Sequence, residues 1–427
     1  MLSLKFIREN PDVVRKNLEK RHDKEKELWV DEILKLDSES RKIKYEIDNL
    51  RNSRNRISEE INQLKKQGKD ASDKIKEAAE IPKKITKLEQ KYKDIDEKLH
   101  YYLMRLPNIL HESVPYGKDD TENEIVNTFG KKPVFDFEPL SHVDIIEKQG
   151  WADLERAAKI SGARWYFLKG DLALLEMAIV KYAIGMITKR GFTLVVPPHM
   201  MNRKAYEGVT SLSDFEDVLY KIEGEDLFMI ATSEHPLTAQ YMDEVIDEKE
   251  LPIKLSGYST NFRKEAGAHG KDQKGIFRVH QFNKVEQIII CKPEDSWDFH
   301  EELIRNHIDF FNSLGLHSRQ VNICTGDIGV VAAKKYDLEV WMPVQKTYRE
   351  VGSCSNCTAY QATRLNIKYR SSEGNKYVHT LNSTLVATTR ALVAIIENFQ
   401  NKDGTIRIPD VLVPYMDGKK KIGVPIR

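Results

Sequence analysis

The sequence contains few cysteines and no long hydrophobic run. Four cysteines in 427 residues are too few to form a disulfide framework. No stretch approaches the roughly 18 uninterrupted apolar residues of a membrane helix, and the N-terminus has neither an apolar signal core nor a small-residue cleavage pattern. We therefore expect a cytoplasmic protein with no membrane partner.

The sequence also lacks a substantial net charge and the common phosphate-binding loops. Its formal charge is +1, so overall charge predicts no partner, and any affinity for nucleic acid must come from a local patch. The patterns GxxxxGKS/T and GxGxxG are both absent, which counts against two widespread nucleotide-binding folds. A chain of 427 residues is too long for one ordinary core, so we expect two or three domains.

A heptad pattern dominates the N-terminal part of the chain. After a short helical start, in which Asn10 and Pro11 fit the N-cap and first position of a helix, apolar residues recur in steps of three, four and seven. The first run comprises Leu36, Ile43, Ile47, Leu50, Ile57, Ile61 and Leu64, and the second comprises Ile75, Ala78, Ile85, Leu88, Tyr92, Ile95, Leu99 and Tyr102. A turn-like segment, 67–72, separates the runs, so the spacing predicts an antiparallel coiled-coil hairpin over about 28–106. We expect Pro82 to kink the second helix or to delay its start.

Lysines are frequent at the positions of this hairpin that the apolar seam leaves exposed. They are Lys65, Lys66, Lys69, Lys74, Lys76, Lys83, Lys84, Lys87, Lys91 and Lys93. Acidic residues are interleaved with them, so one interpretation is a solvated helical surface. The other is a stiff arm that lies along a phosphate backbone, for which a basic cluster near the turn is the expected footprint. The residues alone leave both open.

Proline, glycine and acidic residues mark segment 108–135, which we interpret as a linker. It separates an N-terminal domain, 1–107, from a larger domain, 136–427. In the larger domain short apolar strand patterns mix with helix patterns, such as 172–189 and 297–314, without a βαβ repeat. This mixture favours an α+β fold with an antiparallel sheet flanked by helices.

The most informative stretch of the larger domain is 260–286. Its strand-like flanks, 257–262 and 276–282, predict a long β-hairpin around a glycine-containing middle. The basic residues, glycines and flanking carboxylates of this stretch are Arg263, Lys264, Glu265, Gly267, Gly270, Lys271, Lys274, Gly275, Arg278, Lys284 and Glu286. Guanidinium groups bind polyphosphates through paired, charge-assisted hydrogen bonds. A nucleotide site is therefore one interpretation, and a solvated, salt-bridged hairpin is the other.

Two further stretches place polar residues in apolar surroundings. Thr232 and Glu234 follow a strand pattern and share a face if extended, so Glu234 could bind an ammonium group. Alternatively, Ser233 caps a helix that starts there. In the second stretch, Glu350 and Ser353 could offer oxygen atoms to Mg²⁺, a hard ion that prefers a few protein oxygens plus substrate phosphates.

Two cysteines and a third polar stretch complete the candidates. Cys354 and Cys357 have the spacing of half a zinc site, but no second pair follows, so ordinary buried thiols are the alternative. Asn382 and Thr384 could contact a small polar ligand. Arg390 lies on an otherwise apolar helix, where a lone charge requires a partner. That partner is either a carboxylate or a phosphate.

The chain closely resembles the seryl-tRNA synthetases, a family of class II aminoacyl-tRNA synthetases. Three segments carry the resemblance in order: FRKEAGAHGKDQKGIFRVHQFNKVE, REVGSCSNCTAYQ and HTLNSTLVATTRALVAIIENFQ. In addition, TSEHPLT resembles the serine-binding loop of the family, GFTLVVPP resembles the first class II motif with Pro198 as its proline, and an N-terminal helical hairpin is a family hallmark. The resemblance covers essentially the whole chain. One departure is 382–384, where Asn-Ser-Thr replaces the family's Asn-Gly-Ser and the threonine methyl group narrows the pocket.

The resemblance implies a class II synthetase fold and a homodimeric ligase that uses ATP and Mg²⁺. Such an enzyme activates L-serine to seryl-adenylate with release of pyrophosphate. It then transfers serine to the 3′ end of serine tRNA, and of selenocysteine tRNA where that exists. The hairpin would grip the long variable arm of serine tRNA. Two rivals are a relative that loads a carrier protein, against which the hairpin argues, and a non-catalytic binding protein, against which Arg263, Glu350 and Arg390 argue.

The resemblance also assigns roles to individual residues. It implies that the catalytic residues are Arg263, Glu265, Arg278 and Arg390. It implies that ATP is bound by these four together with Lys264, Val279, Phe282, Glu350, Val351, Gly352 and Ser353, with Phe282 on the adenine and Mg²⁺ held by Glu350 and Ser353. It implies that serine is bound by Thr232, Ser233, Glu234, Arg263, Glu286, Asn382 and Thr384. No side chain becomes a covalent intermediate in this chemistry, so positioning and charge neutralisation would supply the catalysis.

Overall fold

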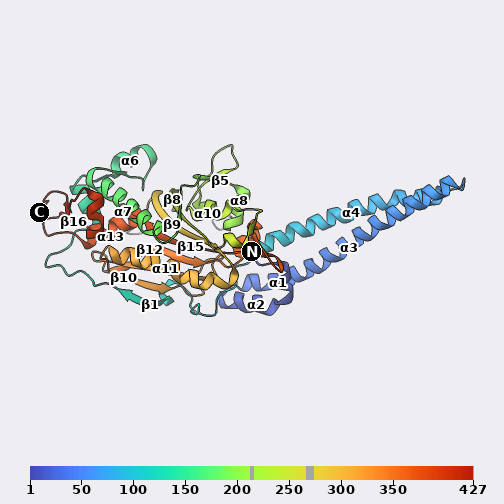
Figure 1. The fold of residues 1–427 in the computed structure, drawn as a ribbon, viewed down its shortest axis with the longest axis horizontal. Helices are drawn as coiled ribbons and strands as arrows, with labels where there is room; N and C mark the ends of the chain where they lie inside the picture. The colour runs from blue at the N-terminus through green and yellow to red at the C-terminus, as the bar shows by residue number, and fades with distance from the viewer. Residues whose placement is uncertain (212–215, 266–273, 427) are drawn as a thin grey trace. The chain divides into compact units, whose positions relative to one another are not determined.

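The computed structural model describes residues 1–211, 216–265 and 274–426, and the chain divides into two compact units, Met1–Pro107 and Asn108–Arg427 (Figure 1). None of the helices in the described part of the chain combines the length and the apolar character needed to cross a membrane.

The regular structure of the N-terminal unit is entirely helical among the described residues. Its helices are α1 (Leu4–Glu9), α2 (Pro11–Lys20), α3 (Lys24–Lys66) and α4 (Ser72–Leu103). Helices α3 and α4 run antiparallel, because ion pairs join Lys74 to Glu60 (2.9 Å) near the turn and Arg51 to Glu89 (2.9 Å) further along. The antiparallel helical hairpin that the heptad spacing predicts is therefore confirmed.

The buried seam of this hairpin differs from the predicted seam near the turn. Ile81 is 6% exposed, whereas the predicted seam residue Ile75 is 45% exposed. Steps of four, three and four back from Ile85 lead to Ile81, Ala78 and Lys74. Ile75 therefore lies one position away from the buried seam, and the prediction that it belongs to the seam is wrong. Of the two alternatives expected at Pro82, a kink or a late helix start, the late start is excluded, because α4 begins at Ser72 and carries Pro82 within it at an exposed position.

The C-terminal unit is built on an eight-stranded sheet in the order β1-β10-β11-β12-β15-β9-β8-β4. Its strands are β1 (Glu124–Phe129), β4 (Thr193–Val195), β8 (Ile253–Phe262), β9 (Gln281–Cys291), β10 (Ser318–Asn322), β11 (Lys334–Met342), β12 (Thr347–Asn356) and β15 (His379–Ala387). Neighbouring strands pair antiparallel except at one edge, where β4 runs parallel to β8. The α+β fold with an antiparallel sheet flanked by helices is as predicted, and β4 adds one parallel pair at the edge of this sheet. Segment 108–135 contributes edge strand β1 to this sheet.

The central β-hairpin is present, but its second strand begins later than predicted. Strands β8 and β9 pair antiparallel, with Phe262 opposite Gln281 at the end nearest the loop. The predicted strand 276–282 overlaps β9 only at its end, because Ile276 and Phe277 are buried in the core instead of extending the ladder. The predicted loop residues Gly267, Gly270 and Lys271 lie outside the described residues.

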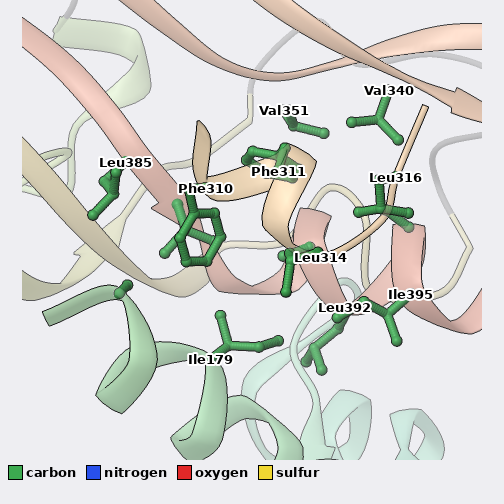
Figure 2. Packing of buried hydrophobic residues seen from close by; sticks show 14 of the residues in the cluster. Ile179, Phe310, Phe311, Leu314, Leu316, Val340, Val351, Leu385, Leu392 and Ile395 are labelled. Atoms are coloured by element: carbon green, nitrogen blue, oxygen red, sulfur yellow. The ribbon is translucent and has the colours of Figure 1, made fainter. Parts of the chain in front are cut away.

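Three helices cover one face of the sheet and enclose the main hydrophobic core (Figure 2). They are α7 (Gly170–Thr188), α11 (Ser296–Ser313) and α13 (Thr388–Asn398). Figure 2 shows Phe310 and Phe311 of α11 among the aliphatic side chains of this core. Successive residues of a strand point to opposite faces, so Val285 of β9 joins the core while its neighbours Lys284 and Glu286 face the other way. The second face of the sheet therefore carries polar side chains.

Shorter elements complete the C-terminal unit. The helices are α5 (His142–Lys148), α6 (Leu154–Ser161), α8 (Arg203–Val209), α10 (Glu234–Ala239) and α12 (Tyr360–Leu365), and the 3-10 helices are η1 (Asp120–Glu122), η2 (Glu216–Val218), η3 (Glu248–Glu250), η5 (Pro293–Asp295) and η6 (Asp410–Met416). The strands are β2 (Ala152–Asp153), β3 (Phe167–Leu168), β5 (Met200–Asn202), β6 (Leu227–Met229), β7 (Val245–Asp247), β13 (Lys368–Ser371), β14 (Gly374–Tyr377), β16 (Ile406–Arg407) and β17 (Lys421–Ile422). Tyr206 of α8, Phe228 of β6 and Ala362 of α12 share a second apolar cluster with Ile290 of β9. This cluster anchors the small helices against the sheet.

Candidate active site

A cavity lies on the polar face of the sheet. It is lined by Thr232, Glu234, His235, Arg263, Glu265, Phe277, Arg278, Val279, Phe282, Lys284, Glu286, Glu350, Val351, Gly352, Ser353, Asn382, Thr384, Ala387, Thr389 and Arg390. These residues come from four stretches that are far apart in the sequence. They converge because β12, β15, β9 and β8 are consecutive neighbours in the sheet.

Two of the predicted site residues lie outside this lining. Ser233 is buried, and its hydroxyl donates to the carbonyl oxygen of Gly257 at 3.4 Å. Ser233 occupies the N-cap position of α10, with Glu234 in the first turn, as the helix-cap alternative predicts, but its side chain makes no capping hydrogen bond there. The Lys264 ammonium lies 5.9 Å from the centre of the Tyr220 ring.

The lining also contains residues that the sequence did not single out as site residues: His235, Phe277, Lys284, Ala387 and Thr389. Lys284 was visible as one charge in a basic stretch, without a distinguishing signal. Lys284 lies two residues before Glu286, so both side chains are on the same face of β9. Only the strand itself shows this placement. His235, Phe277 and Thr389 directly adjoin predicted residues in the sequence, and Ala387 lies between Thr384 and Arg390.

Arginines and carboxylates pair at one end of the cavity. Nη1 of Arg390 lies 3.3 Å from Oε1 of Glu350 and donates to the carbonyl oxygen of the same residue at 3.1 Å. The partner expected for Arg390 is thus a carboxylate in this structure. Nη1 of Arg278 lies 3.6 Å from Oε2 of Glu265. These two arginines belong to different elements, α13 and the β8–β9 hairpin, and face the same space.

Arg263 lies between the two ends of the cavity. Its Nε donates to the carbonyl oxygen of Ala231 at 3.2 Å, and its guanidinium carbon lies 5.3 Å from the centre of the Phe282 ring. Burial, and next the positive charge of Arg390, lower the pKa of Arg263 from its ordinary value. Two guanidinium groups that repel each other in a recess form a site for an anion with several negative charges.

Glu350 is ionised in this setting. Burial raises its pKa, but the charges of Arg390, Lys335 and Arg263 outweigh burial and bring the pKa to about 2. The side chain is 41% exposed, and that surface faces the cavity that it lines. Ser353 lines the same wall, so the two residues present the oxygen atoms that Mg²⁺ prefers.

Protein residues alone do not surround a metal here. In residues 1–211, 216–265 and 274–426, no group of three or more histidine, cysteine, aspartate and glutamate side chains is placed to hold a metal ion. Cys354 and Cys357 are buried free thiols, and burial raises their pKa values well above the ordinary one. Cys354 belongs to the helix-covered core, so the described residues support the buried-thiol interpretation over half a zinc site.

The other end of the cavity combines one ammonium group with hydroxyl and carboxylate groups. Lys284 forms an ion pair with Glu286, and its Nζ donates to Oγ1 of Thr232 at 2.8 Å. Oγ1 of Thr384 lies 3.4 Å from Oε2 of Glu286, its partner across β15 and β9. Burial lowers the pKa of Lys284, and the charge of Glu286 opposes that shift. These groups match a small zwitterion that carries a hydroxyl.

Glu234 is held by a residue that the sequence did not reveal. Nε2 of Gln361, on α12, donates to Oε1 of Glu234 at 3.0 Å and to the carbonyl oxygen of Val209 at 3.0 Å. Oγ1 of Thr380 donates to Oε1 of the same Gln361 at 2.6 Å, which fixes the orientation of the amide. Burial, and next the charge of Glu286, raise the pKa of Glu234 to about 7. Gln361 is therefore a positioning residue for this carboxylate.

Two family models match the chain. The model of the seryl-tRNA synthetase N-terminal domain matches residues 1–110, and that of the tRNA synthetase class II core domain (G, H, P, S and T) matches residues 218–399. The second match contains every residue that lines the cavity. The chain is 58% identical over 421 residues to the serine–tRNA ligase of Methanocella arvoryzae, which covers 98% of this chain and 99% of the relative.

Two solved structures match this chain over nearly its full length. The crystal structure of seryl-tRNA synthetase from Pyrococcus horikoshii complexed with ATP has a TM-score of 0.94, 49% sequence identity, and coverage of 100% of both chains. That of the cytoplasmic serine–tRNA ligase from Naegleria fowleri in complex with AMP has a TM-score of 0.87, 39% identity, and coverage of 99% of both chains.

Proposed function

Because this chain belongs to the seryl-tRNA synthetase family and is a serine–tRNA ligase, we propose that its cavity catalyses both half-reactions of that enzyme. In the first, L-serine and ATP form seryl-adenylate and pyrophosphate. In the second, serine passes to the 3′ end of serine tRNA, and of selenocysteine tRNA where that exists. The observation that carries the proposal is the convergence, in one cavity, of arginines for phosphates at one end and of paired carboxylates and hydroxyls for an amino acid at the other.

The arginine end binds ATP in this proposal. Arg263 contacts the α-phosphate, where negative charge develops as the serine carboxylate attacks, and Glu265 accompanies it. Arg278 and Arg390 hold the outer phosphates through bidentate hydrogen bonds. The ring of Phe282 supports the adenine, with Val279 beside it in the lining. Lys264 lies close by in the chain, outside the cavity lining.

Glu350 and Ser353 would hold Mg²⁺, and Val351 and Gly352 complete this wall of the cavity. The residues fit such an ion, because Mg²⁺ prefers oxygen ligands and Glu350 stays ionised with a pKa of about 2. The ion would supply charge neutralisation to the substrate phosphates.

The opposite end selects serine. The ammonium group of serine is held by Glu234, Glu286 and the hydroxyl of Thr232. Ser233 stabilises the segment between Thr232 and Glu234 through its hydrogen bond to the carbonyl oxygen of Gly257. Asn382 and Thr384 lie beside the serine hydroxyl. A site that hydrogen-bonds a substrate hydroxyl strongly rejects an analogue without it, such as alanine. Threonine is instead excluded by size.

The protein acts as a homodimer in this proposal, and the support comes from helix α7 and the sheet edge. Leu172 of α7 is fully buried, yet Leu174 and Met177 on the same helix are 53% and 54% exposed. Helix α7 contacts the edge strand β4. Leu194 of β4 is 39% exposed, and Val196, which follows this strand, is 67% exposed. A helix that is apolar all round belongs in an interior, and an exposed apolar surface at a free sheet edge suits pairing with a second copy.

The N-terminal hairpin contacts the long variable arm of serine tRNA in this proposal. Lys65, Lys66 and Lys69 are exposed at the end of the hairpin near the turn, so they are available to phosphates. The match of residues 1–110 to the N-terminal domain of the family supports the same role. We place the protein in the cytoplasm, as for the relative that is described as cytoplasmic.

The experiment that tests the proposal is ATP–pyrophosphate exchange without tRNA, with serine, threonine, alanine, cysteine and glycine as candidate substrates. We expect exchange with serine alone. Arg263→Ala should reduce kcat by about 10²- to 10³-fold, the typical effect of removing one group that stabilises developing charge. Arg370→Ala removes an exposed arginine outside the cavity and should behave as the parent. Exchange with a different amino acid would refute the specificity, and no exchange in folded protein would refute the activity.

A further inference from the structure

The ladder of the central hairpin ends one residue before Arg263. Strand β8 ends at Phe262, which lies opposite Gln281, the first residue of β9. The next pair outward is Arg263 and His280. The backbone N–H of Arg263 donates to the carbonyl oxygen of His280 at 2.9 Å, as in a continued antiparallel ladder. The reciprocal donor is diverted, because the backbone N–H of His280 donates to the carbonyl oxygen of Arg164 at 3.2 Å.

The side chain of His280 takes the place of the diverted donor. Its Nδ1 lies 2.9 Å from the carbonyl oxygen of Arg263. A carbonyl oxygen can only accept, so Nδ1 carries the proton in this contact. The hydroxyl oxygen of Tyr220 lies 2.9 Å from the same nitrogen, and the imidazole stacks on the Trp165 ring, with centroids 5.6 Å apart and planes 25° apart. Two aromatic neighbours thus fix the imidazole, and both backbone polar groups of Arg263 bond to His280.

Arg164, between α6 and β3, holds the residues that follow Arg263. Its guanidinium group donates to the carbonyl oxygens of Glu265 at 3.1 Å and Lys264 at 3.4 Å. Arg164 (φ +63°) and Glu265 (φ +50°) both have left-handed backbones, which residues other than glycine adopt rarely and at a cost in free energy. Such strain persists where the surroundings impose it, and it concentrates at active sites. Arg164 contributes to that constraint, since its side chain holds Glu265 and its carbonyl oxygen accepts from His280.

These contacts matter for the charge that develops in the proposed first half-reaction. Arg263 contacts the α-phosphate there, and Glu265 lies beside Arg278, which holds an outer phosphate. The side chain of Arg263 enters the cavity just beyond the end of the ladder, so its aim depends on how the backbone is held at that point. A misplacement of about 1 Å can cost about 100-fold in rate. Residues that fix the backbone of Arg263 and Glu265 therefore control the placement of both groups.

We propose that His280 and Arg164 are positioning residues for the activation of serine. His280 holds the backbone of Arg263, and Arg164 holds the left-handed backbone of Glu265. The inference rests on the proposed function of the cavity and adds two residues that are not part of its lining. Neither residue contacts a substrate, so each acts through the residue that it holds.

Two substitutions at His280 separate its hydrogen bond from its ring. His280→Phe keeps a ring that can stack on Trp165 and removes the donor. His280→Asn removes the ring and keeps an N–H group bonded to the γ carbon, as Nδ1 is. Arg164→Gly removes the guanidinium group and tolerates the left-handed backbone, whereas Arg164→Lys keeps one cationic donor. His100→Phe makes the control change at an exposed histidine of α4. Each full-length variant is assayed for serine-dependent pyrophosphate exchange without tRNA and for its melting temperature.

We expect His280→Phe to lower kcat of exchange about 10- to 100-fold while the melting temperature stays close to that of the parent. KM for ATP should change less than about threefold, because the weakened interaction belongs to the transition state. His280→Asn should recover most of the lost kcat. Arg164→Gly should lower kcat about tenfold, and Arg164→Lys should lie between it and the parent. His100→Phe should exchange as the parent does.

Parental kcat in His280→Phe would overturn the role assigned to His280, and parental kcat in Arg164→Gly would overturn the role assigned to Arg164. Equal losses in His280→Phe and His280→Asn would also overturn the proposal, because the hydrogen bond to Arg263 would not be their cause. Absence of serine-dependent exchange in the parent would instead overturn the proposed function.

Discussion

In the proposed function Glu234 holds the ammonium group of serine, which requires an ionised carboxylate, so lowering the pH from 8 to 6 should weaken the use of serine. Burial, and next the carboxylate of Glu286, raise the Glu234 pKa to about 7. With that pKa, about nine tenths of the protein carries the carboxylate at pH 8 and about one tenth at pH 6. We therefore expect kcat/KM for serine to be about tenfold lower at pH 6 than on its plateau above pH 8. The ammonium group of free serine stays protonated throughout this range.

The assay is serine-dependent pyrophosphate exchange, measured without tRNA between pH 5.5 and 8.5. Glu234→Gln keeps the shape of the side chain and removes its titration, so its weaker activity should show no inflection near pH 7. The neighbouring His235 does not confuse the profile, because burial lowers its pKa to about 3. Glu225→Gln changes an exposed carboxylate outside the cavity and should keep the parental inflection.

Gln361→Met provides a second variant that changes only the environment of Glu234. The Gln361 hydrogen bond lowers the Glu234 pKa, so its removal should move the inflection to higher pH and raise KM more than it lowers kcat. A flat parental profile between pH 6 and 8, or an inflection that persists in Glu234→Gln, would refute the reasoning.

The free energy of unfolding gives a second check, because its dependence on pH has the opposite sign to that of the activity. The folded chain binds the proton more tightly than the unfolded chain, so this group's contribution to stability declines as pH rises from about 4.5 to 7.

Three further predictions concern the hairpin and the apolar surface of α7. Replacing Lys65 and Lys69 with Glu should leave exchange intact, weaken tRNA binding, and reduce the salt slope of log Kd by about 1 per lost phosphate contact. If tRNA affinity at low salt were unchanged, these lysines would be solvated surface residues that do not contact tRNA phosphates. Leu174→Glu should convert the proposed dimer into monomers in sedimentation experiments, and an unaltered mass would exclude this face as the interface. Ile81→Ala should destabilise the hairpin by about 2–5 kcal/mol in hydrogen exchange. Ile75→Ala should change it by less than about 0.5 kcal/mol, and equal effects would contradict the buried seam.

The sequence predicts the helical hairpin well because its signal is local and periodic. Repeated steps of three and four place apolar residues on one side of each helix, and the intervening turn has its own composition. The error at Ile75 has the same origin. An apolar residue one position away from the seam looks like a member of it, and the packing of α3 against α4 shows which register is buried, with Ile81 inside and Ile75 exposed.

The candidate site residues were recognisable as polar groups in apolar strands, whereas their convergence was not. Glu286 lies opposite Thr384 because β9 pairs with β15, and Asn382 lies opposite Ser355 because β15 pairs with β12. These are pairings between distant segments, for which single stretches carry no local signal. Gln361 illustrates the limit, because an isolated glutamine on a short helix becomes meaningful only through its contact with a carboxylate from another stretch.

In the proposed function, the charges of the cavity predict that ATP and Mg²⁺ bind more tightly together than separately. Arg390 pairs with Glu350, and Lys284 pairs with Glu286. A phosphate that draws Arg390 away from Glu350 removes the largest of the positive charges that keep Glu350 ionised, and only Lys335 and Arg263 of the three remain. Mg²⁺ would replace the lost charge, since Glu350 faces the same space. Nucleotide without the metal should consequently bind more weakly than the metal complex by more than the attraction between metal and phosphate alone.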